Sequence, residues 1–99
     1  MRPVESVAII GAGNMGSGIA QKSAQEEFTV QMVDREEKWV ERGHSIIADF
    51  LDEAIQRRIF READVEAIKS RITGVVGTEN VAPDTDLVIE AVFEYLKLI

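Results

Sequence analysis

The feature that most constrains the fold is an apolar run that leads directly into closely spaced glycines. Residues 7–10 (VAII) have the composition of a buried strand, and residues 11–16 (GAGNMG) follow with the pattern Gly-x-Gly-x-x-Gly. Gly11 permits the tight turn out of the strand, Gly13 lets a phosphate approach the backbone, and Gly16 lets the next helix pack on the sheet. The helix start presents unpaired N–H groups and partial positive charge. The pattern therefore predicts a turn that binds the pyrophosphate of a dinucleotide.

A second apolar run and an acid complete the unit around this turn. Residues 28–33 follow after a gap of helical length, and Asp34 stands 18 residues after Gly16. An acid about 20 residues beyond the glycines binds the adenosine ribose in dinucleotide-binding βαβ units. The alternative, a plain tight turn with Asp34 as a helix cap, stays open. Because Asp34 would repel a 2′-phosphate, the expected cofactor is NAD rather than NADP, and Arg35 is a candidate contact for adenine.

The rest of the chain alternates helices and strands, which predicts a Rossmann-type α/β fold with a parallel sheet and helices on both faces. The expected elements are strands at about 5–10, 28–33, 72–76 and 86–92, a helix at about 14–26, a long helix at about 36–57, a short helix at about 62–70 and a loop at 77–85. Right-handed crossovers give the strand order third, second, first, fourth, or a close variant of it. About four strands make an incomplete sheet, so residues 1–99 are expected to be the N-terminal part of a larger NAD-binding domain.

Composition excludes several classes of protein. The net charge of −7 at pH 7 argues against nucleic acid or an anionic membrane as the main partner. The chain has no cysteine, which excludes disulfides and thiolate chemistry. No apolar run approaches the roughly 18 residues of a membrane span, and the N-terminus lacks the apolar region of a signal peptide. We therefore expect a soluble, cytoplasmic protein.

Three segments together resemble the 3-hydroxyacyl-CoA dehydrogenases, including the 3-hydroxybutyryl-CoA dehydrogenases. They are residues 11–21 (GAGNMGSGIAQ), 71–74 (RITG) and 86–94 (DLVIEAVFE), and the resemblance covers essentially the whole chain. The long helix and the short helix after Asp34 also look like that family's insertion beside the nucleotide fold. The resemblance implies an oxidoreductase of fatty-acid metabolism that passes hydride between C3 of a 3-hydroxyacyl-CoA and NAD.

The resemblance also assigns contacts to individual positions. The glycine turn looks like the NAD pyrophosphate loop, Asp34 looks like the ribose acid, and Glu94 matches a family position that contacts NAD. Arg57 stands where relatives carry a basic residue that can meet the phosphates of coenzyme A. The predicted cofactor-binding residues are Gly11, Ala12, Gly13, Asn14, Met15, Gly16, Asp34, Arg35, Ala91, Val92 and Glu94, and the predicted substrate-binding residue is Arg57.

Three positions or regions depart from the family pattern. Relatives usually have glycine at the position of Glu27, so we expect a different turn before the second strand. Relatives usually have a cofactor-contacting lysine at the position of Ile99. The family's catalytic serine, histidine, glutamate and asparagine, and its helical dimerisation domain, come after residue 99. We therefore expect the 99 residues to lack activity alone and to self-associate or need a complementing chain.

Two other functions stay open at this point. A different β-hydroxyacid dehydrogenase would share the glycine turn, although the long helix and residues 90–94 (EAVFE) favour the first interpretation. A non-catalytic nucleotide-binding or interaction module, from a truncated or split gene, would need none of the later catalytic residues. The single histidine, His44, does not match the family's catalytic position and is expected on a helix surface. Acidic residues such as Asp49 and Asp52 are expected to be solvated, because they lack the glycine spacing of a calcium loop.

Overall fold

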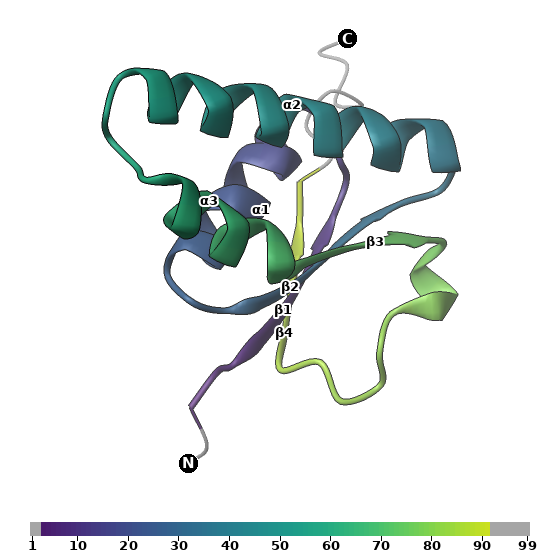
Figure 1. Cartoon of the computed structure of the whole chain (residues 1–99). Coiled ribbons are helices and arrows are strands. Elements are labelled where there is room, and N and C mark those ends of the chain that lie inside the picture. The colour runs from purple at the N-terminus through teal and green to yellow at the C-terminus, as the bar shows by residue number, and fades with distance from the viewer. Residues whose placement is uncertain (1–2, 92–99) are drawn as a thin grey trace, which may run out of the picture.

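The computed structural model describes residues 3–91, which form a sheet with helices packed against it (Figure 1). The elements in chain order are β1 (Ser6–Ile10), α1 (Asn14–Gln25), β2 (Thr29–Asp34), α2 (Glu37–Gln56), α3 (Glu62–Ser70), β3 (Ile72–Val76), the short 3-10 helix η1 (Thr78–Asn80) and β4 (Leu87–Glu90). Each expected helix and strand is present close to its expected bounds, and η1 lies within the expected loop. The α/β class predicted from the sequence is confirmed.

The strands form one parallel sheet in the order β3-β2-β1-β4. In its register, Ile9 of β1 lies opposite Met32 of β2 and Ile89 of β4. This is the order predicted from right-handed crossovers. It places the carboxyl ends of β1 and β4 side by side, at the point where the strand order reverses.

The three α-helices cover the same face of the sheet and contact one another there (Figure 1). The apolar side chains of this face meet those of the helices in one core. Full burial of a large apolar side chain stabilises the folded state by about 1.5–3 kcal/mol, so this interface holds the helices on the sheet. Its buried residues are Val7, Ile9, Ala12, Ala20, Ala24, Val30, Met32, Ile47, Leu51, Val65, Ile68 and Ala91. None of the helices in the described part of the chain is long and apolar enough to span a membrane.

The opposite face of the sheet carries no α-helix within residues 3–91, which corrects the expectation of helices on both faces. The two crossovers, from β1 to β2 and from β2 to β3, run in the same direction along the sheet. Because crossovers are right-handed, their helices lie on the same face. The segment from β3 to β4 crosses the second face as a loop with η1. Gln31 anchors this loop: its Nε2 donates to Thr85 Oγ1 and its Oε1 accepts the Ala82 N–H, both at 2.8 Å. Val88 on the same face remains 53% exposed.

The turn between α1 and β2 keeps a glycine-favouring conformation although Glu27 occupies it. Glu27 has φ +74°. Its N–H donates to the Ala24 carbonyl at 3.0 Å, and the Phe28 N–H donates to the Ser23 carbonyl at 3.1 Å. These two bonds form a Schellman motif, which usually has glycine at this position. The expectation of a different turn was therefore wrong, because the backbone bonds of the helix end set the turn.

Candidate functional site

The glycine turn connects the end of β1 to the start of α1. Gly11 has φ +111°, and its N–H donates to the Val33 carbonyl at 2.7 Å. A Cβ atom at Gly16 would collide with the Gly11 carbonyl. Backbone geometry therefore requires glycine at both positions, one for the turn and one for the close approach of α1 to β1.

The start of α1 offers backbone donors to an anion. Its N-cap residue is Gly13, which supplies no side-chain cap, and the first turn contains no acidic residue. The first N–H groups of a helix have no partner within the helix, and the helix dipole favours negative charge there. Asn14 and Met15 are exposed at this end, Met15 by 49%. These features fit a pyrophosphate held by main-chain groups, with no carboxylate of the first turn to repel it.

Asp34 stands at the end of β2 and is tied to the glycine turn. Its Oδ2 accepts the Ala12 N–H at 3.0 Å, and its Oδ1 accepts the Arg35 N–H at 2.7 Å. The spacing of the acid and the glycines in the sequence predicted this proximity. Each carboxylate oxygen has a further lone pair, so both can still accept a ribose hydroxyl.

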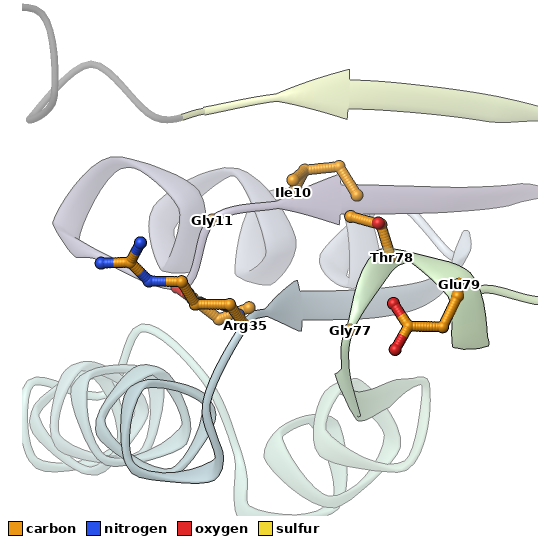
Figure 2. Close-up of a pocket in the computed structure, with 7 residues that line it drawn as sticks. Ile10, Gly11, Arg35, Gly77, Thr78 and Glu79 are labelled. Atoms are coloured by element: carbon orange, nitrogen blue, oxygen red, sulfur yellow. Dashed lines mark hydrogen bonds between the residues drawn. The ribbon is translucent and has the colours of Figure 1, made fainter.

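A pocket of about 330 Å³ opens beside Asp34 (Figure 2). Figure 2 shows the Thr78 side chain directed toward Ile10 and the Glu79 carboxylate beside Gly77. The pocket is lined by Ile10, Gly11, Asp34, Arg35, Gly77, Thr78 and Glu79. The sequence analysis missed the last three residues because they lie in an expected loop. One signal could have found them: the carboxyl ends of parallel strands share an edge, so residues just after the third strand lie near the end of the second.

The end of β4 lies against the glycine turn, as predicted. Ala91 is fully buried, and its N–H donates to the Ile10 carbonyl at 2.8 Å. A Cβ built at Gly16 would lie 3.7 Å from the Ala91 Cβ. The structure therefore brings Ala91 together with the turn. The predicted contacts Val92 and Glu94 lie outside the described residues.

Arg57 and His44 lie apart from this pocket. Arg57 follows the 20-residue helix α2, which begins just after Asp34, so about 30 Å of helix separates them. Its side chain is 69% exposed, and its guanidinium pairs with Glu53 Oε1 at 2.8 Å. His44 is exposed on α2 beside Gly74 of β3, on the helix surface as expected. Within residues 3–91, no three His, Cys, Asp or Glu side chains cluster closely enough to hold a metal ion.

Comparison with known proteins agrees with this geometry. Residues 6–98 match the family described as "3-hydroxyacyl-CoA dehydrogenase, NAD binding domain". The chain is 34% identical over 100 residues to the mitochondrial hydroxyacyl-coenzyme A dehydrogenase of Rattus norvegicus, an alignment that covers 96% of this chain and 32% of the relative. It is 34% identical over 97 residues to the peroxisomal bifunctional enzyme of Danio rerio, covering 98% and 13% of the two chains.

A solved structure shows the same fold. The (S)-3-hydroxybutyryl-CoA dehydrogenase of Ralstonia eutropha matches with a TM-score of 0.85 and 38% identity, covering 90% of this chain and 31% of that one. The chain spans about a third of the length of the curated relatives that it matches first. The family match extends over nearly all of it, and the glycine turn and the acid stand where a dinucleotide needs them. The chain therefore belongs to the NAD-binding domain family of the 3-hydroxyacyl-CoA dehydrogenases, a family of oxidoreductases, and its cofactor is NAD.

Proposed function

We propose that this chain supplies the cofactor-binding part of an enzyme that passes hydride between C3 of a 3-hydroxyacyl-CoA and NAD. The observation that carries the proposal is the hydrogen bond from the Ala12 N–H to Asp34, which joins a phosphate-binding turn to a ribose-binding acid at the edge of a pocket. The nicotinamide supplies the redox chemistry when NAD is bound. The residues described here bind the dinucleotide and fix its orientation.

The proposed contacts follow the strand ends. The pyrophosphate lies over the turn Gly11–Gly16, and the carboxylate of Asp34 accepts hydrogen bonds from the adenosine ribose. A 2′-phosphate would place negative charge against Asp34, so NADH binds more tightly than NADPH. Arg35 contacts the base side of this ribose, and Ala91 borders the turn on the side of β4. Val92 and Glu94 are proposed to extend that border.

The proposed substrate contact is Arg57. Its ion pair with Glu53 is exposed, and exposed pairs contribute about 0–1 kcal/mol, so the guanidinium can exchange Glu53 for a phosphate of coenzyme A at little cost. The acid and base that act on the substrate oxygen are proposed to lie beyond residue 99, as the family resemblance implies. The relatives include proteins named as mitochondrial and peroxisomal, so the cytoplasmic location expected from the sequence stays a prediction.

The phosphate contact is tested by Gly13→Val. The added side chain would occupy the path of the pyrophosphate, so NADH binding measured by calorimetry is expected to be lost while the circular dichroism spectrum is kept. Gly18→Val is the matched control, because a Cβ at Gly18 meets nothing within 4 Å. Undiminished NADH affinity in the Gly13 variant, or tighter binding of NADPH than of NADH by the wild-type chain, would contradict the assignment.

An activity assay separates the proposed role from the other functions. With acetoacetyl-CoA and NADH, the 99-residue chain is expected to bind NADH without oxidising it. Turnover by the chain alone would show that it carries its own acid and base. Binding of a coenzyme A ester separates the remaining alternative. The proposed enzyme part binds the ester through Arg57, whereas a non-catalytic nucleotide-binding module would show no binding that depends on Arg57.

A further inference from the structure

We propose that Glu79, on η1, recognises the adenine base of the cofactor by accepting a hydrogen bond from its exocyclic amino group. This inference rests on the proposed placement of NAD at Asp34 and names the contact that selects the base. Two features carry it: the pocket beside Asp34 has a second acid in its lining, and hydrogen bonds anchor the segment that carries this acid.

The sheet sets the direction in which the dinucleotide extends. The strand order places the ends of β1, β2 and β3 in a row. The glycine turn follows β1, Asp34 ends β2, and Gly77 follows β3 directly. If the pyrophosphate lies at the end of β1 and the ribose at the end of β2, the base lies at the end of β3. In Figure 2, Gly11 and Arg35 lie on one side of the pocket, and Thr78 and Glu79 lie on the other.

Asp34 itself is committed to the ribose end of this row. Both of its carboxylate oxygens accept backbone N–H groups, from Ala12 and from Arg35, which hold the carboxylate against the glycine turn. The lining of the pocket toward β3 then offers two polar side chains, Thr78 and Glu79, with Ile10 as an apolar wall. An apolar wall and a few convergent polar groups are what a base-binding pocket needs.

The segment that carries Glu79 is anchored at both of its ends. The Gly77 N–H donates to the Asp34 carbonyl at 2.8 Å, and Asn80 Nδ2 donates to the Val76 carbonyl at 2.7 Å. Gly77 has φ +87°, and a Cβ there would come within 2.5 Å of Glu79 Oε2. Gly77 therefore both forms the turn and leaves room for the carboxylate. These contacts hold the backbone that carries Glu79 at the pocket before any ligand arrives, so binding does not have to order the segment.

The chemistry of the carboxylate gives a defined selectivity. An ionised carboxylate only accepts hydrogen bonds. Adenine presents an amino group at its sixth position, whereas hypoxanthine presents a carbonyl oxygen there. Glu79 therefore favours NAD and repels nicotinamide hypoxanthine dinucleotide, the deamino analogue. A glutamine at position 79 would serve both bases, because its amide can accept from an amino group or donate to a carbonyl.

The test compares the two dinucleotides by titration of the isotope-labelled chain, followed by NMR. The wild-type chain is expected to bind NAD about tenfold more tightly than the deamino analogue, the scale of a single hydrogen bond to a charged group. In Glu79→Gln this ratio is expected to fall to about one. Glu66→Gln is the matched control, since it removes the same charge from an exposed site on α3, and it should keep the wild-type ratio.

Each other outcome identifies what has failed. A wild-type ratio near one, or an unchanged ratio in Glu79→Gln, overturns the role of Glu79 and leaves the NAD site standing. An equal loss of affinity for both dinucleotides in Glu79→Gln shows a role in loop structure only and also overturns the inference. If neither dinucleotide perturbs the resonances of Gly11 and Asp34 in the folded wild-type chain, the placement of NAD fails, and the inference fails with it.

Discussion

Two charged residues at helix ends adopt the conformation that glycine usually supplies. Glu27 after α1 has φ +74°, and Arg58 after α2 has φ +61°. The second helix end repeats the bonds of the first: the Ile59 N–H donates to the Ala54 carbonyl at 2.8 Å, and the Arg58 N–H donates to the Ile55 carbonyl at 3.0 Å. A left-handed conformation costs a residue with a Cβ about 1–2 kcal/mol. The helix-closing bonds therefore impose a local strain at each residue.

Replacing Glu27 by glycine relieves this strain. We expect Glu27→Gly to raise the free energy of unfolding by about 1 kcal/mol. Glycine removes the strain of positive φ from the folded state, and this gain outweighs the entropy that glycine adds to the unfolded chain. Urea unfolding measures the change. The neighbouring Glu26→Gly is the control: Glu26 has φ −86°, so glycine relieves nothing there and should not stabilise. A Glu27→Gly variant that unfolds at a lower urea concentration than the wild type would contradict the claim that Glu27 is strained.

At the scale of elements, the short edge strand β4 depends on a polar anchor. Asp86, just before β4, accepts three hydrogen bonds at Oδ2: from the Glu5 N–H at 2.9 Å, the Ser6 N–H at 3.0 Å and the Ser6 hydroxyl at 3.2 Å. Leu87 and Val88 remain 45% and 53% exposed, so apolar burial contributes little at the start of β4. The bonds of Asp86 thus hold the start of β4 to the start of β1.

Removing this anchor is expected to loosen β4 first. Asp86→Ala leaves the backbone donors at residues 5 and 6 without their acceptor and should lower the free energy of unfolding by about 1–3 kcal/mol. Hydrogen exchange of the β4 amides is expected to accelerate more than exchange in β2. Asp84→Ala, in the exposed turn before Asp86, is the control and should change neither measurement. Uniform acceleration across the sheet would show that Asp86 is not a local anchor.

At the scale of the whole molecule, the two faces of the sheet differ. The helices bury one face, while the other carries the β3–β4 loop and exposed side chains such as Val88. Within residues 3–91, β4 pairs only with β1, so its outer edge offers unpaired backbone groups. An exposed apolar side chain such as Val88, next to an open strand edge, favours association with another chain.

A charge on that face is expected to reduce association. Val88→Lys should lower the mean particle mass measured by light scattering at high concentration, because burial of the ammonium group would be costly. Ala63→Lys adds the same charge to an exposed position on α3 and should leave association unchanged. The apolar residues Leu98 and Ile99 also favour association, but they lie outside the described part of the chain. A wild-type chain that stays monomeric at high concentration would contradict the prediction.

The sequence by itself determined the elements, the strand order, and the pairing of the glycine turn with Asp34. Each of these depends on local signals: the apolar period, glycines that backbone geometry requires at positions 11 and 16, and an acid at a fixed spacing. Only the tertiary structure decided which faces of the sheet are covered and how the loop after β3 is held at the pocket. Those outcomes depend on the direction of the crossovers and on long-range hydrogen bonds, such as those from Gln31 and Gly77, which join residues far apart in the chain and leave no periodic pattern in it.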